Sequence, residues 1–145
     1  WPLTESFMVE DAETVLVAAG TSAGTCRHVV RQLRAQGKKV GLVRVRMFRP
    51  FPYADIRAML GRAKNVAVLD RSVSPGADSP LCQEVKSALY GLDGGSAAPR
   101  VYGFVAGLGG RDIIPEHIER MVAVAEGEEP PVPGKVIWLG LRDGE

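Results

Sequence analysis

Short runs of β-branched residues alternate with amphipathic helical segments along almost the whole chain, and this alternation restricts the possible folds. The first pair is a strand over 14–19, which ends at Gly20, and a helix over 22–36 whose apolar residues recur at spacings of three and four. Further strands are predicted at 39–46, 65–69, 100–105 and 136–139, with helices at 52–60, 80–90 and 115–125. Because parallel neighbouring strands need crossover helices, this order predicts a three-layer α/β/α fold with a mostly parallel five-stranded sheet.

The length of the chain and its apolar content are those of one compact domain. It has 145 residues, of which 46% are hydrophobic. We therefore expect a single domain over 1–145, with residues 1–12 as a lead-in segment and 128–134, which holds three prolines, as a crossing linker. The opening Trp1-Pro2-Leu3 has no leader-like features and indicates a cut inside a longer polypeptide.

The charge and cysteine content exclude several classes of protein. A net charge of +1 provides no overall field for nucleic acid or an anionic membrane, and apolar stretches such as 101–108 are far shorter than the roughly 20 residues that span a bilayer. We expect neither nucleic acid nor membrane as a partner. The two cysteines, Cys26 and Cys82, have no Cys or His at metal-ligand spacing, so no metal site is predicted. Both occupy apolar helix positions, which favours buried, reduced thiols and a cytoplasmic location.

Four segments should meet at the carboxyl edge of the sheet, where open α/β sheets bind ligands and partners. They are residues 20–24, 46–50, 70–72 and 107–112. The first opens a helix N-terminus, whose free N–H groups suit phosphate or carboxylate, but it has neither the dinucleotide-binding glycine pattern nor a P-loop lysine. An ordinary strand-to-helix turn capped by Thr21 is the alternative. The candidate residues for an anion site are Thr21, Ser22, Arg46 and Arg111.

Arginines and aromatics at the same edge also suit an interface. Several guanidinium groups could recognise carboxylate or phosphate, or pair with another chain; alternatively, Arg46 and Arg49 could be neutralised by Asp70 and Asp112. Phe48, Phe51 and Tyr53 beside prolines could form an apolar contact patch or belong to the core. The candidate interface residues are Arg49, Phe51, Tyr53, Asp70, Arg71 and Asp112.

No catalytic constellation is found in the chain. His28 and His117 lie off the apolar stripes of their predicted helices, no serine occupies a nucleophile elbow, and the thiols lack an activating neighbour. The residues alone therefore predict a scaffold or an assembly surface, and we assign no catalytic residue.

Four motifs together resemble a known family. They are TVLVAAGTSAGT at 14–25, VGLVRVRMFRPFP at 40–52, VAVLDRSVSPG at 66–76 and GLGGRDI at 107–113. In this order they resemble domain II, a transketolase C-terminal-like domain, of the alpha subunit of pyruvate:ferredoxin and related 2-oxoacid:ferredoxin oxidoreductases, over about 1–138. The first motif is similar to transketolases and 2-oxoacid dehydrogenases more broadly.

The resemblance implies an oxidoreductase that decarboxylates a 2-oxoacid, with pyruvate the expected one, on thiamine diphosphate and Mg²⁺. Such an enzyme passes electrons through [4Fe–4S] clusters to ferredoxin and the acyl group to coenzyme A. The chain has no GDG motif and too few cysteines for a cluster, so these cofactors are expected on other domains and subunits. By resemblance this domain packs against the pyrophosphate- and pyrimidine-binding domains and is inactive alone. Two alternatives are a phosphate-binding α/β module and the C-terminal domain of a transketolase or 2-oxoacid dehydrogenase.

Overall fold

The computed structural model describes residues 1–92, 98–129 and 136–141, and from residue 14 onward strands and helices alternate as predicted. The strands are β1 (Thr4–Phe7), β2 (Thr14–Ala19), β3 (Val40–Val45), β4 (Asn65–Asp70), β5 (Arg100–Val105) and β6 (Ile137–Trp138). The helices are α1 (Ser22–Ala35), α2 (Tyr53–Leu60), α3 (Pro80–Leu89) and α4 (Pro115–Ala125), with a short 3-10 turn η1 (Leu108–Gly110) after β5.

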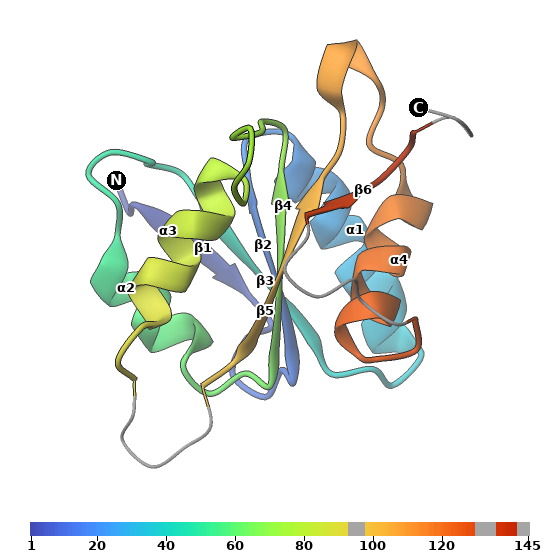
Figure 1. Ribbon diagram of the computed structural model, residues 1–145. Helices are drawn as coiled ribbons and strands as arrows, with labels where there is room; N and C mark the ends of the chain where they lie inside the picture. The colour runs from blue at the N-terminus through green and yellow to red at the C-terminus, as the bar shows by residue number, and fades with distance from the viewer. Residues whose placement is uncertain (93–97, 130–135, 142–145) are drawn as a thin grey trace.

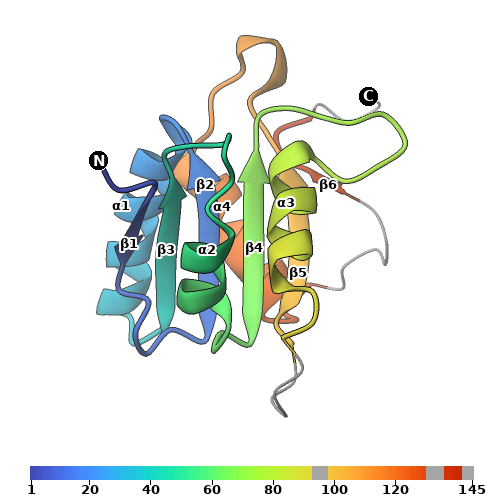
Figure 2. The same ribbon diagram turned by 90° about the vertical axis from the view of Figure 1, so that its left-hand side faces the viewer.

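The strands form one sheet in the order β1-β3-β2-β4-β5-β6. Every pairing is parallel except that of β1 with β3. Figure 1 shows the three layers, with α2 and α3 on one face of the sheet and α1 and α4 on the other. The predicted α/β/α fold with a mostly parallel sheet is confirmed. In Figure 2 the carboxyl ends of the parallel strands lie along the upper edge.

The sheet has six strands rather than the predicted five, because the expected lead-in segment 1–12 contains β1. This strand pairs with β3 from Thr4 opposite Val45 to Phe7 opposite Leu42. Guanidinium groups of α1 hold the segment in place: those of Arg27 and Arg31 lie 4.6 and 5.5 Å from the centre of the Phe7 ring. Four residues carry too little periodicity to predict a strand, and the open edge of β3 provides the pairing. The predicted linker at 128–134 lies outside the described residues from residue 130 onward.

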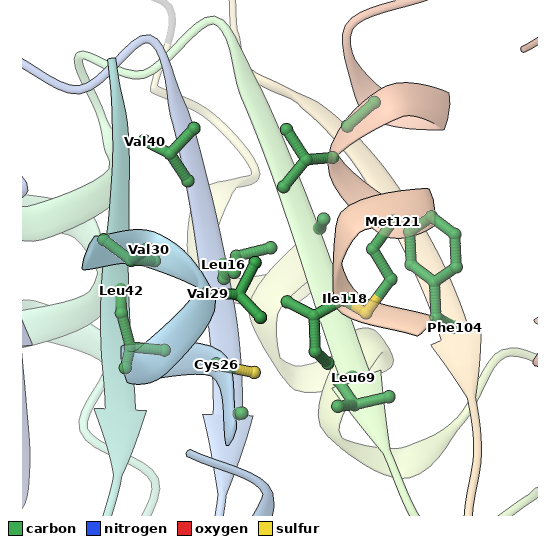
Figure 3. Close-up of a cluster of buried hydrophobic side chains, with 14 of the residues drawn as sticks. Leu16, Cys26, Val29, Val30, Val40, Leu42, Leu69, Phe104, Ile118 and Met121 are labelled. Carbon is green, nitrogen blue, oxygen red and sulfur yellow. The ribbon is translucent and has the colours of Figure 1, made fainter. Parts of the chain in front are cut away.

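Two hydrophobic cores fill the spaces between the layers. Successive strand residues point to opposite faces, so Leu16 packs under α1 and α4 while Val15 and Val17 pack under α2 and α3. Figure 3 shows the first core, in which Leu69 and Phe104 of the sheet face α4. Burial of one such side chain contributes about 1.5–3 kcal/mol. The two cores fix the sheet and so position the loops at its carboxyl edge.

Candidate interface at the carboxyl edge of the sheet

Exposed apolar side chains gather at the carboxyl edge of the sheet. Ten large hydrophobic residues are exposed among the described residues, and only Met8 and Tyr90 lie at the opposite edge. The other eight, which we call the carboxyl-edge surface, are Trp1, Met47, Phe48, Tyr53, Val73, Ile114, Trp138 and Leu141. Interaction surfaces are typically rich in exposed apolar side chains, so these eight residues are the candidates for a contact.

The loop between β3 and α2 carries part of this surface, and a buried aromatic ring in the loop supports the exposed ones. Phe51 is buried, and its ring packs edge-on against Tyr53 and Phe48 at centroid distances of 5.1 and 6.1 Å. The guanidinium of Arg49 lies 4.2 Å from the centre of the Phe48 ring, a cation–π arrangement. Phe51 thus belongs to the core, while Phe48 and Tyr53 remain at the surface.

Glu84 of α3 holds this loop from the side. Its carboxylate receives hydrogen bonds from Arg49 Nη2 at 2.7 Å and from the Tyr53 hydroxyl at 2.5 Å. The hydrogen bond from Tyr53 lowers the pKa of Glu84, with a further contribution from Arg49, and the same bond raises the pKa of Tyr53. Sequence reasoning missed Glu84, because a glutamate more than thirty positions away on an amphipathic helix carries no local signal of this contact.

Asp70 and Arg71, at the end of β4, fasten neighbouring loops. Asp70 Oδ2 accepts the backbone N–H of Leu81 in the first turn of α3 at 2.8 Å, and its Oδ1 accepts the Ser72 hydroxyl at 2.8 Å. Arg71 donates to the Gly107 carbonyl at 3.3 Å and to the Thr21 hydroxyl at 3.5 Å. Asp70 therefore satisfies one free backbone N–H in the first turn of α3, and Arg71 spans the gap between the loops after β2 and β5.

The predicted neutralisation of Arg46 and Arg49 by Asp70 and Asp112 is wrong. Arg46 pairs with Glu5 of β1 at 2.7 Å, and Arg49 pairs with Glu84 as described above. Asp112 is exposed and has no hydrogen bond or ion pair among the described residues. Arg46 and Arg49 pair with glutamates because β1 and α3 lie beside them. The sequence pattern did not predict that these two elements would be neighbours of the arginines.

The four candidate residues for an anion site are not brought together. Thr21 is exposed, and the Ser22 hydroxyl is buried and donates to the Ala19 carbonyl at 2.7 Å. Arg46 follows β3, whereas Arg111 follows β5 and donates to the Gly140 carbonyl at 3.5 Å. Since β2 and β4 lie between β3 and β5, the two arginines start roughly 14 Å apart and do not form one clamp.

A hollow of about 720 Å³ lies at the same edge, between the loop after β4 and the end of β6. Residues 73–79 form one side, and Val105 and Trp138 form the other. The hydroxyl of Ser79 is buried there and has no hydrogen-bond partner among the described residues. A buried hydroxyl without a partner costs free energy unless an incoming group bonds to it.

The described residues show little capacity for chemistry of their own. Within the described ranges, no group of three or more His, Cys, Asp and Glu side chains could hold a metal ion. Burial raises the pKa of both Cys26 and Cys82 to about 12, so neither thiol is an activated nucleophile. No helix in this part of the chain is long and apolar enough to cross a membrane.

The architecture defines the class of the domain first: it is an α/β domain whose fold is like that of part of a transketolase. A split-gene transketolase in an inactive tetramer superposes with a TM-score of 0.59 at 14% identity, over 84% of this chain and 40% of that one. A 2-oxoglutarate:ferredoxin oxidoreductase from Magnetococcus marinus superposes with a TM-score of 0.64 at 24% identity, over 84% of this chain and 19% of the other. At these identities the likeness concerns the fold.

The sequence then identifies the family. Residues 12–118 match the pyruvate:ferredoxin oxidoreductase core domain II, and the chain belongs to that family. The pyruvate synthase subunit PorA of Thermotoga maritima is 44% identical over 96% of this chain and 34% of its own length. The ketoisovalerate oxidoreductase subunit VorA of Pyrococcus furiosus is 36% identical over 97% of this chain and 35% of its own length. The chain thus spans about a third of the length of these relatives, and the resemblance seen in its motifs is confirmed.

Proposed function

We propose that this chain is a non-catalytic assembly domain of a thiamine-diphosphate-dependent 2-oxoacid:ferredoxin oxidoreductase that acts on pyruvate. The carboxyl-edge surface carries the proposal, because eight of the ten large hydrophobic side chains that are exposed among the described residues lie on this one edge. Its partners are the other domains of the same subunit and the neighbouring subunits, with ferredoxin as the electron acceptor of the whole enzyme. Membership of the family and the names of the PorA relatives support the choice of enzyme.

The structure of the edge suits a permanent contact. The aromatic loop is held by Glu84 before any partner arrives, so little side-chain freedom is lost on docking. Trp138 and Val73 border a hollow in which an incoming group would satisfy the Ser79 hydroxyl. Preformed aromatic anchors beside a polar group are typical of the centre of a stable interface.

The cofactors of such an enzyme do not fit the residues of this chain. A [4Fe–4S] cluster takes four cysteine thiolates, whereas the chain has two cysteines, which are buried in separate cores. The described residues likewise contain no acidic cluster that could bind the Mg²⁺ of a thiamine diphosphate site. In the proposal, both groups and the coenzyme A site are held by other parts of the enzyme, and the isolated chain is inactive.

Substitutions at the carboxyl edge of the full-length subunit test the proposal. Phe48→Asp combined with Trp138→Asp places two charges in the proposed contact, and we expect the yield of assembled enzyme to fall by roughly tenfold or more. Size-exclusion chromatography of the subunit produced with its companion subunits measures assembly, and pyruvate-dependent ferredoxin reduction measures activity. Both should fall together.

Tyr90→Asp provides the matched control, since Tyr90 is even more exposed but lies at the opposite edge. Circular dichroism of the isolated domain checks that all variants are folded. Normal assembly and activity of the double variant would show that the carboxyl edge is not the docking face.

A further inference from the structure

A second hollow, which we call the amino-edge hollow, lies at the opposite edge of the sheet. Its volume is about 550 Å³. Residues 61–65 between α2 and β4 form one wall, Ala98, Arg100 and Tyr102 form a second, and residues 125–127 after α4 form a third. In Figure 2 this is the lower edge, where β4 and β5 begin. Assembly through the carboxyl edge would leave it open.

Two arginines in this hollow differ from every other cation that the structure describes. Sixteen of the eighteen Lys and Arg residues lie in the described ranges, and fourteen of these make a hydrogen bond, an ion pair or an aromatic contact. The remaining two are Arg62 and Arg100, which have no such partner within the described residues. Both line the amino-edge hollow.

The other charged groups of the hollow are already paired. Lys64 donates to Glu13 at 2.8 Å. Glu126, the one carboxylate among the described lining residues, accepts from Lys38 at 3.0 Å and from the Thr14 hydroxyl at 3.4 Å. Among the described residues, no carboxylate therefore pairs with the two guanidinium groups of the hollow, in a chain whose net charge is only +1.

Interaction with the C-terminal ends of α2 and α4 does not explain why Arg62 and Arg100 lie in the hollow. Cations near helix C-termini are stabilised by the helix dipole, and α2 and α4 both end beside the hollow. In this molecule such a cation bonds directly to terminal carbonyls: Arg57 donates to the carbonyls of Ala88 and Tyr90 at the end of α3. Arg62 and Arg100 make no bond of this kind in the described part of the chain.

We propose that the amino-edge hollow binds a small anion that carries two or more acidic groups, phosphate or carboxylate. Each free guanidinium offers a planar pair of N–H donors that matches one such group. Lys64 adds positive charge, and the partly buried Tyr102 forms an apolar wall. The volume lies within the range of small-molecule sites. The site is independent of the assembly proposal, because it uses other residues at the other edge.

Isothermal titration of the chain with pyrophosphate and, separately, with citrate tests this site and distinguishes phosphate from carboxylate ligands. At low ionic strength we expect saturable binding of at least one of them with one site per chain. Arg62→Gln and Arg100→Gln should each weaken binding by about tenfold, because each removes a charge-assisted pair of hydrogen bonds, and the double variant should not bind measurably. Arg62→Lys keeps the positive charge but loses the planar pair of N–H donors, so this variant should bind with intermediate affinity.

Arg120→Gln is the matched control, since Arg120 is an exposed arginine of α4 that pairs with Glu129 outside the hollow. It should bind like the unaltered chain. Because the side chains of Arg62 and Arg100 make no hydrogen bond, ion pair or aromatic contact among the described residues, their variants should melt at close to the temperature of the unaltered chain, so lost binding would not reflect unfolding. The proposal is wrong if neither anion gives saturable heat, or if the double variant binds as tightly as the unaltered chain.

Discussion

The thiol groups of Cys26 and Cys82 are buried in different cores, one on each face of the sheet. Burial disfavours the thiolate, which raises both pKa values to about 12. For Cys82 the positive charge of Lys86 opposes this shift, but desolvation is the larger effect. Each cysteine therefore acts as a small apolar residue, as the helical pattern predicted.

We expect neither thiol to react rapidly with a thiol reagent such as dithionitrobenzoate in the native protein. The thiolate is the attacking species, and a pKa near 12 leaves almost none of it at pH 8. Absorbance at pH 8 should show slow labelling in buffer and two equivalents at once in concentrated guanidinium chloride. Rapid labelling of one thiol in buffer would mean that its core is open to solvent.

At the scale of elements, a glycine in β3 allows the segment before β2 to pack closely against this strand. A Cβ atom on Gly41 would lie 2.6 Å from the Met8 carbonyl oxygen, 3.0 Å from Val9 Cα and 3.1 Å from Ala12 Cβ. Two of these atoms belong to the backbone, which cannot move aside as a flexible side chain would. The segment is also held by Arg34, which donates to the Met8 carbonyl and to Asp11. What the sequence suggested as a lead-in is thus packed tightly on the sheet.

Gly41→Ala should destabilise the domain by about 1–3 kcal/mol, the usual cost of overpacking. Urea unfolding followed by circular dichroism measures the free energy of unfolding. Gly24→Ala is the matched control: this glycine lies within α1 with open space around it, so alanine should stabilise the helix by up to about 1 kcal/mol. Equal stabilities for Gly41→Ala and the unaltered chain would contradict the tight packing of residues 8–12.

At the scale of the whole molecule, carboxylates connect segments that are distant in sequence. Glu5 of β1 pairs with Arg46 and Arg27, Glu13 pairs with Lys64, and Glu84 joins α3 to the aromatic loop. Hydrogen bonds from Arg46, Lys64 and Tyr53 respectively lower the pKa of these three glutamates below their ordinary value near 4.5. The three carboxylates are partly exposed, so solvent and salt weaken each contribution.

The lowered pKa values of these glutamates determine how the stability of the protein changes at acid pH. A carboxyl group whose pKa is lower in the folded protein stabilises it fully above the unfolded pKa, and this contribution is lost as pH falls through the folded pKa. The melting temperature should therefore be constant near neutrality and fall between about pH 5 and pH 3. Calorimetry across this pH range measures the melting temperature, and 0.5 M NaCl should make its decrease at acid pH smaller. A melting temperature that rises on acidification would contradict the role of these pairs.

Local sequence patterns by themselves determined the bounds of several helices and strands and the family of this protein. The strand at 14–19 and the helix at 115–125 have the predicted bounds, and the helix predicted over 22–36 is α1 to within a residue. The family was also evident from motifs such as RPFP at 49–52, because such motifs are contiguous in sequence. Periodicity is a property of neighbouring residues, so these features could be predicted without knowledge of the tertiary structure.

Contacts between distant segments were decided only by the tertiary structure. β1 forms because β3 would otherwise have an open edge, and Arg46 and Arg49 find Glu5 and Glu84 because β1 and α3 lie beside their loops. The meeting of Arg62 and Arg100 in one hollow depends on the pairing of β4 with β5. A charge in a sequence does not specify its partner, because the order of strands and the packing of helices determine which side chains come within reach.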